Sequence, residues 1–233
     1  MKHTHEELKA KALQAVDGLE RVYPAKCSLE YQKPHELLMA VRLSAQCTDA
    51  RVNMVTGPLF EAYPTPQAFA EADVADVERL IQSCGLYKTK ARDLVGIGKV
   101  LTEQYGGRVP DTIEELVKLP GVGRKTANLV VGDIYGKPAV VCDTHCIRIT
   151  NLLGLTTGTD PLKVELQLRD ILPMDRANDF CHRLVLFGRE TCIARRPRCQ
   201  GCPLQGCCDH GQGLDSRPDP APPKKRGAKK AAR

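Results

Sequence analysis

The apolar residues of this 233-residue chain recur every three or four positions along most of its length, as in the series Leu94, Ile97 and Leu101. This spacing gathers the apolar side chains on one face of an α-helix. No segment shows the two-residue alternation of a half-buried strand, and residues 139–142, which permit an extended conformation, are too few to seed a sheet. The sequence therefore predicts an all-α fold with about ten helices.

Helix boundaries carry separate signals. Thr112 followed by Glu115 has the spacing of a capping box, which satisfies free backbone N–H groups at a helix start. Three prolines stand where first helical positions are expected: Pro34, Pro66 and Pro161. Glycines mark expected helix ends: Gly85, Gly106, Gly107 and Gly188. These signals agree with the helical periodicity of the segments between them.

The charge of the chain is unevenly distributed. There are 34 Lys and Arg residues against 28 Asp and Glu residues, a formal charge of +6, and all of that excess falls in residues 217–233. The rest of the chain is formally neutral, so any basic surface on it must arise from an uneven placement of charges. From about residue 212 the composition shifts to Gly, Pro, Ala and Lys, which bury too little apolar surface to offset the entropy of ordering. The sequence predicts a disordered basic tail over 212–233.

Composition also excludes several classes of protein. With 4% aromatic residues and no Trp, the chain has few rings on which a single-stranded nucleic acid would stack. No uncharged apolar run approaches the ~18 residues of a membrane helix, and the charged N-terminal segment is unlike a leader peptide. Eleven cysteines are an odd number and too sparse for a secreted disulfide scaffold. We expect a reduced, intracellular protein without a membrane segment.

Four cysteines near the C-terminus have the spacing of a metal centre: Cys192, Cys199, Cys202 and Cys208. Six, two and five residues separate them, and thiolates are the ligands shared by zinc and iron–sulfur sites. Zinc ribbons usually contain two Cys-x2-Cys pairs, whereas this segment has one such pair flanked by single cysteines. The spacing favours a [4Fe-4S] cluster over zinc, and Cys207 competes with Cys208 for the fourth position.

Three arginines lie between the first two of these cysteines, at Arg195, Arg196 and Arg198. A loop held at both ends by a metal cluster is rigid, and the planar guanidinium group suits the binding of phosphate. We interpret residues 193–198, which we name the arginine loop, as a basic surface directed at a phosphate backbone.

Residues 116–131 follow a capped helix and begin another, with Gly121 and Gly123 in the turn between them. Glycines allow a tight turn whose backbone N–H groups point outward at the start of the second helix, where they can bind an anion such as phosphate. Apolar residues at matching positions, such as Leu119 and Ala127, complete the helix-hairpin-helix pattern. This pattern predicts sequence-independent binding to the DNA backbone.

Lys125 lies in the first turn of the second helix of this hairpin. It is either one more phosphate contact or a nucleophilic amine, activated by the positive end of the helix and by Arg124. Asp143, eighteen residues later, begins the next helical segment. It either caps that helix or stabilises a cationic, oxocarbenium-like centre, as carboxylates do in glycoside cleavage. The residues alone leave both alternatives open.

Four motifs together resemble the endonuclease III family: Leu-Pro-Gly-Val-Gly-Arg-Lys-Thr-Ala at 119–127, Val-Cys-Asp-Thr-His at 141–145, Ser-Ala-Gln-Cys-Thr-Asp at 44–49, and the four-cysteine pattern. The resemblance extends over about residues 6–210. Members of this family are bifunctional DNA glycosylases and abasic-site lyases of the helix-hairpin-helix superfamily. The lysine and the cysteine spacing are the specific parts of the match, whereas many DNA-binding proteins share the glycine-rich hairpin.

The resemblance implies two helical domains with a cleft between them. A six-helix barrel that contains the helix-hairpin-helix would span residues 27–137, and a [4Fe-4S] cluster domain would combine residues 1–26 with 138–211. The damaged nucleotide would be flipped into the cleft, because its anomeric carbon is out of reach within the base stack. The basic tail 212–233 is an addition that short bacterial members lack.

The resemblance also implies roles for individual residues. Lys125 would attack the anomeric carbon of an oxidised pyrimidine nucleotide and form a Schiff base whose β-elimination cleaves the strand, while Asp143 stabilises the positive charge. Gln46 would fill the space left by the flipped base, Leu86 would wedge into the opposite side, and His145 would shape the pocket. The residues expected to bind DNA are Gln46, Leu86, Gly121, Gly123, Arg124, His145, Arg195, Arg196 and Arg198. The implied partner is double-stranded DNA with damaged pyrimidines or abasic sites, bound by a monomer at the nucleoid of a bacterial cytoplasm.

Two other functions remain open from the sequence. An adenine-mispair glycosylase of the same superfamily shares the hairpin and the cluster, but it has no lysine at the position of Lys125. It also uses a carboxylate on the helix before the glutamine, and residues 37–47 contain no acid. A non-catalytic iron–sulfur protein that binds DNA or senses redox state would have no use for Lys125 together with Asp143. Both comparisons favour the bifunctional enzyme.

Overall fold

The computed structural model describes residues 3–214. Within that range the chain forms eleven α-helices and one short 3₁₀-helix without any β-strand, so the predicted all-α fold is confirmed. The elements are α1 (His5–Glu20), α2 (Pro34–Ser44), α3 (Asp49–Ala62), α4 (Pro66–Ala70), α5 (Val74–Ile81), α6 (Tyr87–Tyr105), α7 (Ile113–Leu116), α8 (Arg124–Tyr135), α9 (Thr144–Leu153), α10 (Pro161–Ile171), α11 (Ala177–Glu190) and η1 (Gln205–Cys207). None of the helices in residues 3–214 is long and apolar enough to cross a membrane.

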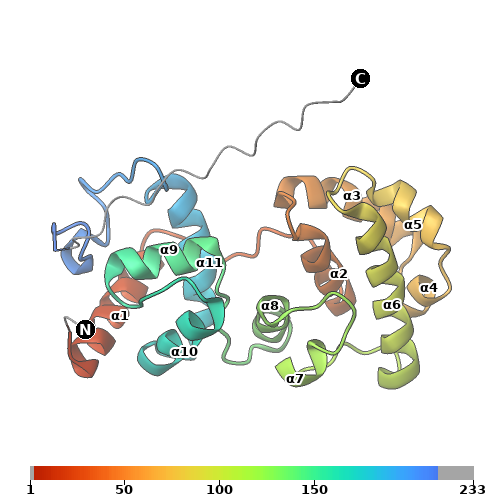
Figure 1. Cartoon of the computed structure of the whole chain (residues 1–233), viewed down its shortest axis with the longest axis horizontal. Helices are drawn as coiled ribbons and strands as arrows, with labels where there is room; N and C mark the ends of the chain where they lie inside the picture. The colour runs from red at the N-terminus through yellow and green to blue at the C-terminus, as the bar shows by residue number, and fades with distance from the viewer. Residues whose placement is uncertain (1–2, 215–233) are drawn as a thin grey trace.

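The helices form two groups, each around its own hydrophobic core (Figure 1). Buried residues between Leu29 and Val131 make up the first core, and most of them lie on α2 to α8. The second core combines buried residues between Ala12 and Tyr23 with others between Val140 and Cys207. We name these groups the first lobe and the second lobe. The N-terminal helix α1 therefore packs with α9, α10 and α11, far from it in sequence.

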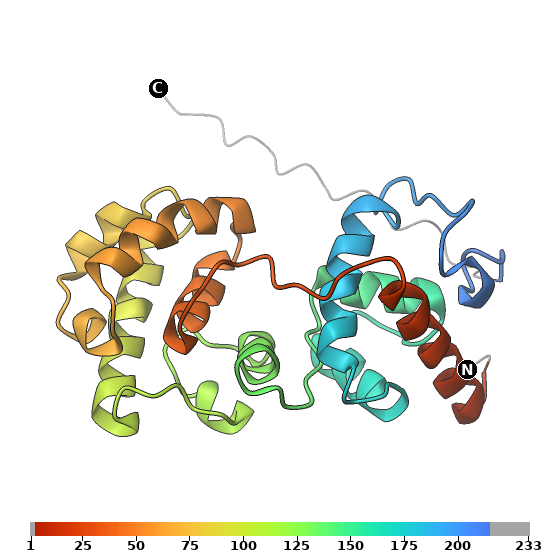
Figure 2. The ribbon, with the colours of Figure 1, turned by 180° about the vertical axis from the view of Figure 1, so that it is seen from behind.

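Helix α8 lies between the two lobes (Figure 1). The side chain of Leu129, on α8, packs against both cores. At Gly132 the helix comes so close to α11 that a Cβ atom would overlap with the side chain of Asn178. Seen from behind, the segment 21–33 crosses from the second lobe to the first (Figure 2), and residues 136–143 return the chain to the second lobe. The lobes are thus joined by two chain segments and by the packing of α8.

Most predicted helix boundaries are confirmed, because they depend on local signals. Thr112 accepts a hydrogen bond from the Glu115 N–H at the start of α7, and Gly106 ends α6 with a φ of +58°. The three prolines each stand in a first helical turn: Pro34 in α2, Pro66 in α4 and Pro161 in α10. The prediction that Gly188 ends a helix is wrong, because α11 continues through it to Glu190.

The predicted tail 212–233 falls almost entirely outside the described residues. Its first three residues, 212–214, are described, and they turn back onto the preceding segment. The Leu214 N–H donates to the carbonyl oxygen of Asp209 over 2.8 Å, and the Gln212 N–H donates to that of Cys208 over 3.0 Å. The remainder of the prediction, over 215–233, is not tested.

Candidate active site

Helix α8 begins at a turn that leaves its first backbone N–H groups open. Its N-cap is Gly123, which has no side chain to accept a hydrogen bond from them. A Cβ atom on Gly123 would meet nothing within 4 Å, so the turn faces open space. Lys125 lies in the first turn with its side chain exposed. The helix start therefore presents N–H donors, the positive end of the helix dipole and a primary amine to solvent.

The hairpin before α8 rests on an ion pair inside the first lobe. Gly121 has a φ of +67°, a left-handed conformation that favours glycine. A Cβ atom there would also lie 2.6 Å from the Asp93 Oδ2 atom and would overlap with Arg42. Arg42 Nε donates to Asp93 Oδ2 over 2.8 Å, and the two side chains are 12% and 18% exposed. The two glycines of the hairpin thus have different roles. Gly121 allows the turn to pack closely on Arg42 and Asp93, and Gly123 leaves the start of α8 accessible from outside.

Arg124, the first residue of α8, has a partner on the second lobe. Its Nε donates to Glu165 Oε2 over 2.7 Å and its Nη2 donates to Glu165 Oε1 over 2.8 Å. The Glu165 side chain is 4% exposed and that of Arg124 is 41% exposed. The sequence predicted that Arg124 contacts DNA and activates Lys125. The structure pairs this guanidinium group with a buried carboxylate that the sequence did not single out, and the contact with DNA stays a prediction.

Asp143 caps α9, and its carboxylate has hydrogen-bond partners in the first turn of that helix. Its Oδ1 accepts a hydrogen bond from the Cys146 N–H over 2.7 Å, and its Oδ2 lies 3.4 Å from His145 Nδ1. The side chain is 16% exposed. Burial opposes ionisation, yet the hydrogen bonds from His145 and Cys146 and the positive charge of Lys125 together lower the pKa of Asp143 below its usual value. The charge of Lys125, from the other lobe, is thus the smallest of the effects that lower the pKa of Asp143.

His145 packs against α11 at a glycine whose role the sequence did not reveal. A Cβ atom on Gly188 would lie 2.5 Å from His145 Cδ2 and 3.0 Å from Ile149 Cδ1. A glycine inside a helix costs ~1 kcal/mol relative to alanine, so its presence there is itself a signal of close packing. Gly188 makes room for the imidazole that hydrogen-bonds to Asp143.

Gln46 and Leu86 share an unusual backbone conformation. In residues 3–214 they are the two non-glycine residues with a positive φ, at 56° and 61°. A left-handed conformation costs ~1 kcal/mol or more outside glycine, and such strain concentrates at functional sites. Both side chains are exposed, Leu86 by 58%. Their loops touch, since a Cβ atom on Gly85 would lie 3.6 Å from the Gln46 carbonyl oxygen. The structure thus brings together the two residues expected to fill a distorted base stack.

Lys90 fixes these two loops from inside the first lobe. It is fully buried, and its Nζ donates to the Leu43 carbonyl oxygen over 2.6 Å. Burial lowers the pKa of Lys90. Leu43 stands near the end of α2, just before Gln46, and Lys90 is in the first turn of α6, just after Leu86. The sequence analysis missed Lys90, although its place on the apolar stripe of Leu94 was a signal.

One pocket beside α9 and α11 is lined by all four predicted metal ligands: Cys192, Cys199, Cys202 and Cys208. Cys207 is not part of its lining, and its thiol donates to the Leu204 carbonyl oxygen over 3.5 Å. N–H donors reach the sulfur atoms, from Leu204 N to Cys202 Sγ over 3.4 Å and from Arg148 Nη1 to Cys192 Sγ over 3.5 Å. Hydrogen bonds to sulfur are among the features that tune iron–sulfur clusters. The chemistry of these donors therefore fits such a cluster, and Cys208 rather than Cys207 lines the pocket with the other three cysteines.

Burial in the same pocket makes ionisation of the cysteine thiols unfavourable unless a positive charge is added. Burial raises the pKa of Cys208 to about 11, and it also raises the pKa of Cys192 and of Cys202. Within residues 3–214, no group of three or more His, Cys, Asp or Glu side chains lies close enough together to hold a single metal ion. A metal centre deprotonates the thiols that bind it, and its charge would offset the cost of burial.

Comparison with known proteins places this geometry in a family. Residues 39–174 match the HhH-GPD superfamily of base excision DNA repair proteins. Endonuclease III of Bacillus subtilis (strain 168) is 44% identical over 204 residues, which cover 87% of this chain and 93% of that protein. Endonuclease III of Escherichia coli (strain K12) is 39% identical over 208 residues, which cover 89% and 99%. A solved structure of a trapped endonuclease III–DNA covalent intermediate superposes with a TM-score of 0.82 at 42% identity, covering 88% of this chain and 97% of that one.

The chain belongs to the endonuclease III family. The resemblance seen in the four sequence motifs is thereby confirmed, and the chain is a base excision repair DNA glycosylase. Family membership also decides against a non-catalytic iron–sulfur protein, which was one of the alternatives that the sequence left open.

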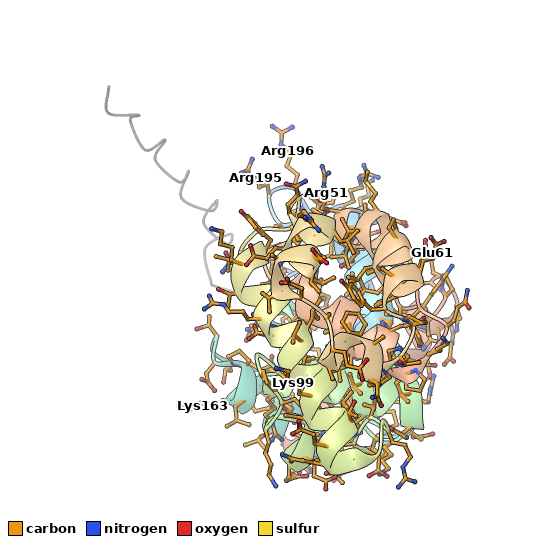
Figure 3. The ribbon with its side chains drawn as sticks, turned by 90° about the vertical axis from the view of Figure 1, so that its right-hand side faces the viewer. Arg51, Glu61, Lys99, Lys163, Arg195 and Arg196 are labelled. Carbon is orange, nitrogen blue, oxygen red and sulfur yellow. The ribbon has the colours of Figure 1, made fainter. Side chains whose placement is uncertain are left out.

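In this endonuclease III family member the arginine loop is exposed on the second lobe. Figure 3 shows Arg195 and Arg196 projecting at the same end of the molecule as Arg51 of α3. Arg198 is also exposed, and its backbone N–H donates to the Thr191 carbonyl oxygen over 2.9 Å. The base of the loop is thus attached to the end of α11, and basic side chains of both lobes project at one end of the molecule.

Proposed function

We propose that this endonuclease III family member removes oxidised pyrimidines from double-stranded DNA and cleaves the resulting abasic site by β-elimination. The observation that carries the proposal is an exposed lysine at an open helix start, Lys125, together with a largely buried carboxylate on the other lobe, Asp143, whose pKa is lowered. An amine supplies a nucleophile for a sugar carbon, and a carboxylate supplies a negative charge for the cation that forms there. The trapped DNA covalent intermediate of the 42% identical neighbour supports a covalent step.

The proposed reaction begins with the damaged nucleotide outside the base stack. The Nζ atom of Lys125 attacks the anomeric carbon, and the bond to the base breaks with its electron pair leaving on the base. The sugar ring then opens to a Schiff base between Nζ and that carbon. Loss of a proton from the neighbouring C2′ atom expels the 3′ phosphate and cleaves the strand. Asp143 stabilises the positive charge that develops on the sugar and on the Schiff base.

DNA binding would use the groups around this centre. The open N–H groups after Gly123 suit a phosphate, since they lie at the positive end of α8. Gln46 would enter the space of the flipped base and Leu86 would separate the neighbouring bases. Both side chains are exposed, and they stand on neighbouring loops. His145 would form one wall of the pocket beside Asp143.

We assign the two lobes as two domains that hold DNA between them, residues 27–137 and residues 1–26 with 138–211. Their separate hydrophobic cores support the division. Lys125 comes from the first domain and Asp143 from the second, so the reaction would take place at their boundary. We further propose that the protein acts as a monomer in a bacterial cytoplasm, in keeping with the bacterial sources of its relatives.

The four cysteines would hold a [4Fe-4S] cluster with a structural role. The pocket that they line and the N–H donors at their sulfur atoms support this assignment. When bound, the cluster would supply positive charge to four buried thiolates and fix both ends of the arginine loop. Arg195, Arg196 and Arg198 would then meet DNA phosphates from a rigid loop. The protein as purified should absorb near ~400 nm and contain about four irons per chain. Stoichiometric zinc without iron would contradict the assignment.

The substrate proposal is tested with a panel of duplexes and borohydride, which reduces a Schiff base to a stable adduct. The panel contains an oxidised pyrimidine, an abasic site, an adenine mispair and undamaged DNA. We expect covalent adducts and strand cleavage with the first two duplexes and neither with the last two. Release of adenine without an adduct would favour the adenine-mispair enzyme, and the absence of any adduct with the abasic duplex would overturn the proposed lyase activity.

A further inference from the structure

Glu165 lies at the centre of a hydrogen-bonded network between the two lobes. Its carboxylate, 4% exposed, accepts two bonds from Arg124 on α8, at 2.7 and 2.8 Å. It also accepts from Asn128 Nδ2 over 3.2 Å and from Arg169 Nε over 2.9 Å. Asn128 is fully buried and, like Arg124, belongs to α8. A buried carboxylate that is this fully satisfied is a rigid attachment point.

The network reaches the backbone on both sides of the proposed reaction centre. Arg124 is the residue immediately before Lys125, and the Asn128 side chain donates to its carbonyl oxygen over 3.2 Å. The oxygen of the same amide, Asn128 Oδ1, accepts from the Val140 N–H over 3.3 Å. Val140 belongs to the buried segment 139–142 and stands three residues before Asp143. A single polar cluster thus joins the turn that carries the lysine to the segment that carries the carboxylate.

We infer that Glu165 is a positioning residue for the glycosylase reaction, which holds the first turn of α8 so that Lys125 and Asp143 keep their spacing. The inference rests on the proposed function, because it takes Lys125 as the nucleophile. The two residues belong to different lobes and stand eighteen positions apart, so their spacing depends on contacts such as this network as well as on the chain between them. A misplacement of ~1 Å in a reacting group lowers a rate by as much as ~100-fold.

The first test is Glu165→Gln, assayed by single-turnover borohydride trapping on an abasic duplex with enzyme in excess. The variant keeps the shape of the side chain, but its NH₂ group faces the N–H groups of Arg124, so the network opens. We expect the rate of adduct formation to fall about tenfold or more. The Kd for the same duplex should stay within about twofold, since Glu165 is buried and distant from solvent.

Asp133→Asn is the matched control on the same helix. Asp133 is a second buried carboxylate, 5% exposed, that attaches the other end of α8 to α11. Its Oδ1 accepts from Asn178 Nδ2 over 2.7 Å and lies 2.7 Å from His182 Nε2. It is eight residues from Lys125, ~12 Å along the helix. We expect this variant to lose thermal stability as Glu165→Gln does, but to form the adduct within about twofold of the wild-type rate.

Arg124→Lys provides a second test in case Glu165→Gln does not fold. The Arg124 side chain is partly exposed, so its substitution disturbs the packing less. Lysine retains a positive charge for phosphate but loses the two-pronged contact with the carboxylate. If Arg124 acts through Glu165, the variant slows adduct formation about as much as Glu165→Gln does. The double variant should then be no slower than the slower single variant, because both changes remove one interaction.

The outcomes separate this inference from the proposed function. No adduct with the wild-type protein would mean that the proposed lyase is wrong, whatever the variants do. A wild-type adduct together with an unchanged rate in Glu165→Gln would overturn the positioning role. So would equal losses of rate in Glu165→Gln and Asp133→Asn, since a general loosening of α8 would then explain both.

Discussion

Two helices begin near the proposed reaction centre, and they differ in whether a side chain accepts hydrogen bonds from their first backbone N–H groups. Helix α9 begins at Asp143, whose carboxylate accepts from the Cys146 N–H and is 16% exposed. Helix α8 begins at Gly123, which has no side-chain cap and faces open space. The same backbone geometry thus gives one satisfied, buried helix start and one unsatisfied, open helix start.

Because of this difference, we expect the two helix starts to have separate roles. The capped start fixes a negative charge that belongs to the protein, and the open start leaves room for a negative charge that belongs to DNA. Lys125 stands in the open turn and Asp143 forms the capped one. A nucleophile for a DNA sugar needs both conditions: a nearby carboxylate for the sugar cation and free access for the phosphate backbone.

The largest expected effect follows from removing the amine of the open start. Lys125→Ala should lower borohydride-trapped adduct on an abasic duplex by at least ~1,000-fold, because no other group is proposed to attack the anomeric carbon. Its Kd for the duplex should change much less, since the backbone N–H groups remain. Lys163→Ala, at another exposed lysine (Figure 3), is the control and should behave as wild type. An adduct of wild-type yield in Lys125→Ala would show that another amine is the nucleophile.

The next effect tests the charge of the capped start. Asp143→Asn should keep the cap of α9, because asparagine accepts from an N–H as well as aspartate does. The rate of adduct formation should fall about 100-fold, since the negative charge that faces the sugar cation is gone. Asp160→Asn is a matched control, because Asp160 caps α10 through the Lys163 N–H over 2.8 Å. If Asp143→Asn reacts at the wild-type rate, Asp143 serves only as a helix cap.

A pair of alanine substitutions in the hairpin tests the open start itself. Gly123→Ala adds a methyl group in open space, so stability should stay within ~0.5 kcal/mol of wild type while the Kd for DNA rises about tenfold. Gly121→Ala should lower the free energy of unfolding by about 2 kcal/mol or more, because φ is positive and the methyl group meets Arg42 and Asp93. Urea unfolding and DNA titration measure the two effects. Unchanged DNA affinity in Gly123→Ala would mean that the backbone does not approach this turn.

The sequence predicted the helices and most of their boundaries, because these depend on local signals. Apolar periodicity and the prolines of first turns depend on residues within a few positions of each other, and the structure confirms them. Gly188 was misassigned because a helix-ending glycine and a close-packing glycine have the same local appearance. Only the contact with His145, 43 residues earlier, distinguishes them.

In the candidate site too, contacts between residues far apart in the sequence could not be predicted. Lys125 and Asp143 were singled out because their motifs are compact in sequence. The partners of Arg124 and Lys90 were not, since Glu165 and Leu43 lie 41 and 47 positions away. Buried polar residues on apolar helix faces were the available signal, but the sequence does not show which group satisfies them. The strained backbone of Gln46 and Leu86 is likewise a property of the folded loops.

The smallest effect concerns the pH dependence of the capped start. Because the pKa of Asp143 is lowered in the folded protein, the ionised carboxylate contributes stability above its unfolded pKa of ~3.9. That contribution is lost as the pH falls through the folded value. In Asp143→Asn it is absent at every pH, so wild type should lose stability more steeply in acid, by at most ~1.4 kcal/mol per pH unit for one proton. Urea midpoints between about pH 3 and pH 6 measure the difference. Parallel curves would show that His145 and Cys146 do not favour the carboxylate, and the two helix starts would then differ in access alone.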